Sequence, residues 1–229
     1  MPKATKAKKP TDKNKAWMRV KMKEKPYTNN TIEKQKYFLI VCEGETEKFY
    51  FKSFPVATAE VEAIEARMSN TKLVEYAEYL SKLEEYKGYE VWCVFDYDIN
   101  PSIENQKQDY DFAIEYAVNQ DFNVAYSNDA FELWYVLHYK DVSGELLRDV
   151  YFDFLGEKWG INYRNNGKTI AFAKTVYQKF ENDKEAKQSE AINRAKRLYE
   201  SQKEKPYSEQ NPCTTVFELV LELNKYLKK

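Results

Sequence analysis

Three short and largely apolar runs, separated by helical patterns, constrain the fold of this chain more than any other feature. They lie at residues 37–42, 89–95 and 122–126. Their β-branched and aromatic members are typical of strands buried on both faces. Strands of this kind that alternate with helices form parallel βαβ units, whose crossover helices cover the sheet. A further strand is expected within residues 56–67, although the segment Val-Glu-Ala-Ile-Glu-Ala found there is equally compatible with a helix.

Helical patterns fill the intervals between these strands and continue after the last of them. Residues 45–54 predict a helix ended by Pro55, Asn70 caps a helix that extends to Tyr86, and a third helix runs from Ser102 to about Asn119. The strand signals then cease. The remaining helices are predicted at residues 130–140, 143–155, 169–180, 185–203 and 213–228. The fold class is therefore α/β, with a parallel four-stranded sheet flanked by helices and a helical C-terminal portion.

Charge is distributed unevenly along the 229 residues. Residues 1–25 hold ten Lys and Arg against two acidic residues, a local charge of +8, which leaves −9 for the rest of a chain with net charge −1. We predict a disordered basic arm at residues 1–30, an α/β core at 36–128, and a helical portion at 129–229 packed on that core. Two interpretations of the arm stay open: contact with nucleic-acid phosphates, or a solubilising tail without a partner.

Composition excludes several classes of protein. The longest unbroken apolar run has six residues, too few to cross a bilayer, and the lysine-rich N-terminus lacks the apolar segment of a secretory signal. The three cysteines are scattered without a CxxC pair, which excludes a disulfide scaffold and a cysteine-rich zinc module. We expect a cytoplasmic protein with no membrane contact.

Acidic and polar residues follow the predicted strands, at the edge where open parallel sheets bind ligands. They are Glu43, then Asp96 and Asp98, then Ser127 and Asn128. In extended backbone, residues i and i+2 share a face, so Asp96 and Asp98 are expected to point the same way. Carboxylates gathered in this manner suit a hard divalent ion, Mg²⁺ or Mn²⁺. The alternative is that these are ordinary surface carboxylates, with Glu43-Gly44 forming only a turn.

Further candidates lie close to these strand ends. Glu47 is a possible accessory residue of the site, or simply complements the dipole of its helix. Glu132 is expected near the metal because its helix begins at a strand exit; the alternative is burial against a basic partner. Asn128 is an accessory candidate or a helix cap. Trp134 and His138, four residues apart on one helical face, are interpreted as core residues.

Basic residues in the C-terminal portion are candidates for nucleic-acid contact. Arg194 and Arg197 share a helix face and could grip phosphates, although Glu190 and Glu200 are near enough to pair with them. Lys168 ends a turn-rich loop that either approaches the substrate or has no role.

Five sequence blocks resemble the RloB family, whose members are Toprim-fold proteins encoded beside restriction-modification and abortive-infection genes in bacteria. The blocks follow the family's order over about residues 37–223. They are LIVCEGETEKFYF (39–51), VFDYDIN (94–100), AYSNDAFELWYVLHY (125–139), AINRAKRLY (191–199) and NPCTTVFELVLEL (211–223). The chain departs from the family pattern at Asp129-Ala130, where many relatives have a Pro-Cys-type pair, and at Phe217, where relatives usually carry His.

The resemblance implies a Toprim-like fold and metal-dependent phosphodiester chemistry. Glu43 matches the Toprim glutamate, a general acid/base or metal ligand, while Asp96 and Asp98 match the metal-binding aspartates. The first hypothesis is an Mg²⁺- or Mn²⁺-dependent nuclease of anti-phage defence that acts on DNA or RNA, with an ATPase encoded alongside as a candidate partner. The others are an inactive Toprim module that binds nucleic acid or that ATPase, and a nucleotide- or signal-binding regulator.

Overall fold

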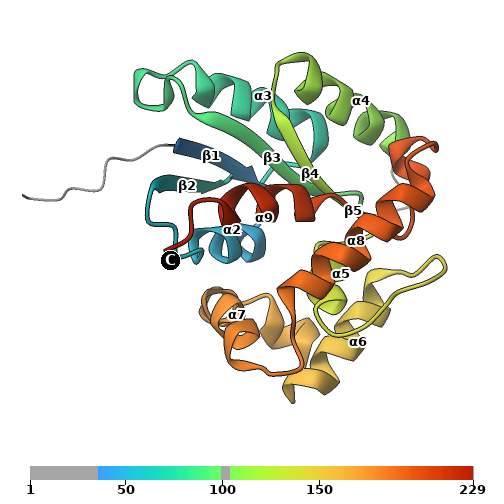
Figure 1. Ribbon diagram of the computed structural model, residues 1–229. Helices are drawn as coiled ribbons and strands as arrows, with labels where there is room; N and C mark the ends of the chain where they lie inside the picture. The colour runs from blue at the N-terminus through green and yellow to red at the C-terminus, as the bar shows by residue number, and fades with distance from the viewer. Residues whose placement is uncertain (1–35, 99–103, 229) are drawn as a thin grey trace, which may run out of the picture. The chain divides into compact units, whose positions relative to one another are not determined.

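A five-stranded sheet carries the fold of this chain, for which a computed structural model describes residues 36–98 and 104–228 (Figure 1). The strand order is β2-β1-β3-β4-β5. The first four strands are parallel, and β5 is antiparallel to β4. The strands are β1 (Lys36–Cys42), β2 (Ala59–Glu65), β3 (Glu90–Asp96), β4 (Asn123–Asn128) and β5 (Cys213–Thr214). The three apolar runs thus form interior strands, and the ambiguous segment at 56–67 is a strand.

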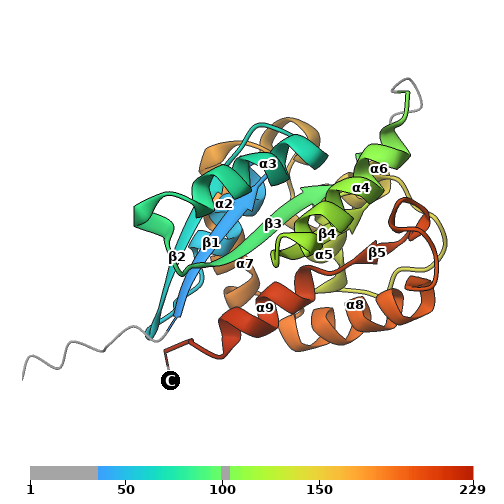
Figure 2. The ribbon, with the colours of Figure 1, turned by 90° about the horizontal axis from the view of Figure 1, so that it is seen from above.

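Helices connect these strands and cover both faces of the sheet (Figure 2). Those that precede the end of β4 are α2 (Glu45–Lys52), α3 (Asn70–Ser81), the 3₁₀ turn η2 (Glu84–Tyr86) and α4 (Gln106–Asn119). Those that follow are α5 (Glu132–Leu137), α6 (Arg148–Trp159), the π-helical turn η3 (Tyr163–Gly167), α7 (Ile170–Asn182), α8 (Gln188–Gln202), the 3₁₀ turn η4 (Tyr207–Glu209) and α9 (Val216–Asn224). The predicted α/β class with a helical C-terminal portion is confirmed.

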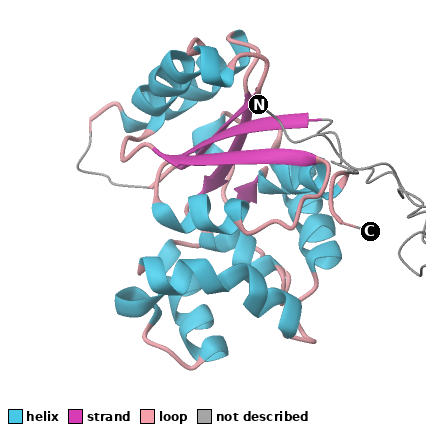
Figure 3. Cartoon of the chain, turned by 90° about the vertical axis from the view of Figure 1, so that its left-hand side faces the viewer, coloured by secondary structure: helices cyan, strands magenta, loops and turns pink. Residues whose placement is uncertain are grey.

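Alternate residues of each strand serve two separate cores, as Figure 3 shows by the helices on either side of the strands. In β1, Leu39 and Val41 pack with residues of α3 and α4. Phe38 and Ile40 point to the opposite face and join a larger, aromatic-rich core with α2 and α5 to α9. Residues 38–42 of β1 and 91–95 of β3 are all buried, so these continuous apolar runs are explained by burial on both faces of the sheet.

The structure corrects the prediction in several places. The helix predicted from a cap at Asn70 to Tyr86 has Ser69 as its N-cap and ends at Ser81, and η2 is a separate turn after it. The sheet has five strands rather than four, because Cys213 and Thr214 pair with Asn128 and Ser127 instead of beginning a helix. A two-residue strand leaves no periodic signal, so only its tertiary pairing reveals it. The helix predicted at residues 143–155 begins only at Arg148, whose backbone N–H donates to the Asp129 side chain at 2.9 Å.

Some predictions fall outside the described residues. These include the basic arm at residues 1–30 and the helix start at Ser102. The proposed division into arm, core and C-terminal portion stays a prediction. Among the helices that the structure describes, none is long and apolar enough to cross a membrane.

Candidate active site

A cavity of about 280 Å³ lies at the carboxyl ends of β1 and β3. Glu43 follows β1 directly, and Asp96 is the last residue of β3. The Glu43 N–H donates to the Val94 carbonyl oxygen at 3.0 Å, and the Asp96 N–H reaches Glu43 Oε2 at 3.4 Å. Parallel pairing therefore brings two distant acidic residues together. The cavity is lined by Glu43, Gly44, Glu45, Thr46, Glu47, Glu65, Asp96, Asp98, Arg148 and Lys168.

Asp96 lies at the end of β3 with its two carboxylate oxygens in different environments. Its Oδ2 accepts a hydrogen bond of 2.9 Å from the Phe131 N–H, where the chain enters α5. Its Oδ1 is buried and has no hydrogen-bond partner among the described residues. Burial raises the pKa of Asp96 well above its usual value, and the neighbouring carboxylates Glu47, Glu43 and Glu132 raise it further.

Glu47 is part of the same cluster and not only a helix-dipole residue. It lies in the first turn of α2 with 8% exposure, and its Oε2 likewise has no partner within the described ranges. Gly44 makes room for this carboxylate, since a Cβ there would lie 3.0 Å from Glu47 Oε2. Burial raises the pKa of Glu47 to about 7. Its side chain thus serves both the helix start and the cavity.

The Glu43 side chain is less buried than that of Glu47, but it too lies close to other carboxylates. Burial and the charge of Glu47 raise its pKa to about 7, against a lowering contribution from the Asp96 N–H. Glu43 also lines a second hollow, of about 560 Å³, which continues from the cavity past Arg67, Met68, Ser69 and Lys72. Arg67 there pairs with Glu65 at 3.0 Å. The acidic cavity therefore opens onto a surface that carries cations.

Glu132 and Lys168 meet at the opposite wall, so Glu132 has the basic partner that one interpretation expected, while its charge also acts on Asp96. Glu132 is buried, accepts a 3.2 Å hydrogen bond from the Tyr163 hydroxyl, and lies 3.6 Å from Lys168 Nζ. The charges of Glu132, Asp96 and Glu47 raise the pKa of Lys168 despite its partial burial. The loop of Lys168 thus approaches the site. Gly167 permits this packing, because a Cβ at that position would lie 2.3 Å from the Tyr163 ring.

Asp98 departs from the predicted extended geometry. It lies beyond the end of β3 with φ of 50°, in the left-handed region, so it does not share a strand face with Asp96. Its side chain is 56% exposed and forms an ion pair with Arg148. Arg148 also pairs with the buried Asp129 at 3.1 Å. Asp98 still lines the cavity, but through an arginine-held turn rather than strand alternation.

The donor set fits a hydrated divalent cation. The cavity offers only oxygen from its acidic side chains, and two buried carboxylate oxygens there lack partners. Across residues 36–98 and 104–228, no group of three or more His, Cys, Asp or Glu side chains is arranged so that it could hold a metal ion by itself. Mg²⁺ commonly keeps several waters and takes only one or two carboxylates, which agrees with this more open arrangement.

The other predicted basic residues are engaged elsewhere. Arg194 Nη1 donates to the Leu137 carbonyl oxygen at 2.8 Å, and its Nε lies 3.5 Å from Asp141. Arg197 pairs with the same aspartate at 2.5 Å, so the partner is Asp141 and not the predicted Glu190 or Glu200. Neither arginine lines the carboxylate cavity. Their contact with nucleic acid stays a prediction.

Three polar candidates near α5 lie in the interior. The Trp134 indole N–H donates to the Tyr50 hydroxyl at 2.8 Å, and His138 stacks on Phe180 with ring centroids 4.0 Å apart. Burial lowers the pKa of His138 to about 4. The Asn128 amide donates to the Ser208 carbonyl oxygen at 3.2 Å, so it anchors η4 and does not line the cavity.

Sequence reasoning missed Arg148, Glu65 and the cations Arg67 and Lys72. No motif marks them, because each reaches the site through tertiary packing. A usable signal existed for Arg67 alone, which directly follows the predicted strand at 56–67 and therefore had to lie at the same sheet edge.

Comparison with known protein families assigns this chain to one of them. The model of the RloB-like protein family matches residues 38–223. The chain belongs to the RloB-like family. That match includes Glu43, Glu47, Asp96, Glu132 and Lys168, and the α/β sheet fits the Toprim-like architecture that the resemblance implied. Comparisons with curated proteins and with solved structures found no match.

Proposed function

We propose that this RloB-like protein is a metal-dependent nuclease that cleaves nucleic-acid phosphodiesters in bacterial anti-phage defence. One observation carries the proposal. Four carboxylates, Glu43, Glu47, Asp96 and Glu132, interact electrostatically at the strand ends, with two partnerless buried oxygens among them and Lys168 beside them. Such an arrangement destabilises the protein unless a cation is bound, so we expect it to be kept for chemistry. The defence role rests on the resemblance to RloB proteins.

Glu43, Asp96 and Asp98 are the proposed residues that hold Mg²⁺ or Mn²⁺, one or two of them directly and the rest through coordinated water. Glu47 is added to them because its buried Oε2 has no partner within the described residues. When bound, the ion would supply neutralisation of charge on the scissile phosphate and a more acidic water.

The chain's own groups have separate tasks. Glu43 would accept a proton from the attacking water, since it is less buried than Glu47 and Glu132 and lines both hollows. Lys168 and Arg148 would contact the phosphate oxygens within the cavity. Arg67 and Lys72 line the adjoining hollow, where neighbouring phosphates of a strand would lie.

The test is cleavage of plasmid, single-stranded DNA and total tRNA by the purified protein with Mn²⁺, compared with Glu43→Gln. The variant keeps the size and hydrogen bonding of Glu43 but cannot exchange a proton. We expect it to fold and to bind nucleic acid while its cleavage rate falls by about 10²–10⁴-fold. Glu75→Gln, at an exposed position on α3, is the matched control and should cleave at the wild-type rate.

Wild-type rates for Glu43→Gln between pH 6 and 9 would show that Glu43 is not the acid/base. Absence of cleavage by every protein, with or without the neighbouring ATPase, would favour the inactive module that binds nucleic acid, a nucleotide signal or that ATPase.

A further inference from the structure

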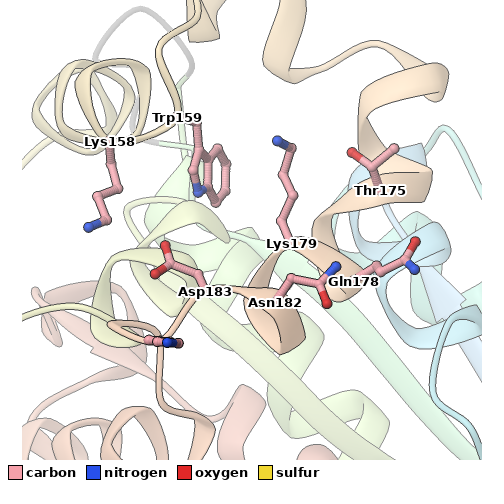
Figure 4. Close-up of a pocket in the computed structure, with 8 residues that line it drawn as sticks. Lys158, Trp159, Thr175, Gln178, Lys179, Asn182 and Asp183 are labelled. Atoms are coloured by element: carbon pink, nitrogen blue, oxygen red, sulfur yellow. The ribbon is translucent and has the colours of Figure 1, made fainter.

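A third hollow, of about 740 Å³, lies between α6 and α7 and shares no lining residue with the carboxylate cavity (Figure 4). Lys158 and Trp159 reach it from the end of α6, while Thr175, Gln178, Lys179 and Asn182 reach it from α7. Asp183 and Lys184, which follow α7, complete the lining. In Figure 4 the indole of Trp159 stands between the side chains of Lys158 and Lys179.

The aromatic wall of this hollow is held rigidly. The Trp159 indole N–H donates to the Tyr139 hydroxyl at 2.9 Å, and its ring contacts Phe172 and Phe180 at centroid distances of 5.4 and 5.8 Å. The position of the indole is therefore set by the core and does not depend on a ligand. A rigid ring at the edge of a hollow is a ready platform for a planar group.

The charge of the hollow is positive. Asp183, its one acidic residue, accepts hydrogen bonds from the Tyr139 hydroxyl at 3.1 Å and from the Glu185 N–H at 2.9 Å. Lys158 pairs with Glu185. Lys179 and Lys184 form no ion pair with any residue of the described chain, and Lys179 Nζ is kept 5.4 Å from the Phe172 ring centroid. Lys179 and Lys184 therefore both line the hollow without an ion-pair partner in the described part of the chain.

We infer that this hollow binds a nucleoside phosphate. The ammonium groups of Lys179 and Lys184 would bind the phosphate. The amides of Gln178 and Asn182 each offer a donor and an acceptor, the pattern that pairs with the edge of a base. The indole supplies apolar surface for the base or sugar. The volume of the hollow lies in the range of small-molecule sites, about 300–1,000 Å³.

The same chemistry is presented by a free nucleotide and by the phosphorylated end of a nucleic-acid strand. The inference does not depend on the proposed nuclease activity, because the hollow has its own residues. All measurements are therefore made in EDTA, which removes divalent ions from the carboxylate cavity.

The experiment is calorimetric titration of the full chain with inorganic phosphate, AMP, ATP and a single-stranded hexanucleotide with or without a 5′-phosphate. We expect AMP or ATP to bind more tightly than inorganic phosphate. Lys179→Glu/Lys184→Glu should weaken that binding by at least about tenfold, since it removes two charge-assisted contacts. Lys82→Glu/Lys87→Glu makes the same charge change after α3 and should bind as the wild type does. Gln178→Ala/Asn182→Ala should reduce AMP binding to the level of inorganic phosphate.

Two results would overturn the inference: no binding of any probe at millimolar concentration, or binding that the Lys179/Lys184 variant leaves unchanged. Equal binding of phosphate and AMP would also overturn it, because the hollow would then recognise an anion only. Binding restricted to the 5′-phosphorylated hexanucleotide would support a strand end as the source, and binding of AMP or ATP would support a free nucleotide.

Discussion

The two faces of the sheet bury their residues under different constraints. The face covered by α3 and α4 is packed with apolar side chains such as Leu73, Val74 and Ile114. The opposite side of the molecule, built by α2 and the helices after β4, holds the buried carboxylates Glu47, Asp129 and Glu132 and the buried His138. The face covered by α3 and α4 therefore contributes only to stability. On the opposite side, the burial of charged side chains lowers the stability of the fold. Substitutions on the two faces should therefore differ in sign as well as in size.

Leu73→Ala tests the purely apolar face and should have the largest effect. Leu73 is fully buried, so its truncation leaves a cavity and should lower the free energy of unfolding by about 2–5 kcal/mol. The binding of Mn²⁺ by the folded protein should not change. Urea denaturation gives the first quantity and calorimetry the second. If a folded Leu73→Ala protein lost affinity for Mn²⁺, the claim that this face serves stability alone would be wrong.

Asp96→Asn tests the charged side and should act in the opposite sense. Without metal the variant should be at least as stable as the wild type, because it removes a buried charge that faces Glu43 and Glu47. At an Mn²⁺ concentration of 100 times Kd, the wild type should gain about 2.7 kcal/mol of unfolding free energy, and the variant should gain almost none. Asp121→Asn, in an exposed turn, is the control. An equal gain in Asp96→Asn would remove this residue from the metal site.

Gly167→Ala tests the wall that carries Lys168. The new Cβ would overlap the Tyr163 ring, so the turn η3 must shift at a cost of about 1–3 kcal/mol. Tyr163→Phe removes only the hydroxyl bonded to Glu132 and should cost less, about 1 kcal/mol. Chemical denaturation measures both. Should Gly167→Ala prove as stable as the wild type, the close packing of Tyr163 on this glycine is not required.

His138 should have the smallest effect, visible as a pH dependence. Its folded pKa is about 4 because of burial, with the charge of Arg194 lowering it further, whereas the unfolded value is near 6.5. The unfolded chain therefore takes up a proton first, so stability is lost as pH falls below about 6.5. Between pH 7 and 5.5 the loss should be about 1 kcal/mol. The difference in unfolding free energy between wild type and His138→Phe, followed over this range, isolates the histidine. A difference independent of pH would contradict the assignment.

Local patterns were sufficient for the three interior strands of the sheet because these are short, continuous and largely buried on both sides. The runs at 37–42, 89–95 and 122–126 each became an interior strand. Once they are parallel, Glu43 and Asp96 must lie at one edge of the sheet. Their direct contact depends in addition on the strand order, which places β1 beside β3. Asp98 shows where this logic ends. The backbone of Asp98 itself is left-handed, so the side chain does not point as it would in a continued strand, and no periodicity in the sequence encodes that change.

The sequence by itself therefore determined the parallel sheet, its covering helices and the acidic strand ends, because these depend on short-range periodicity and on the rule that parallel strands share an edge. Tertiary structure alone decided which cations meet those acids. Arg148 arrives through its pairing with Asp98 and Asp129, and Lys168 through the packing of Gly167 on Tyr163. Such contacts join residues far apart in the chain and depend on how helices dock, which no local pattern records.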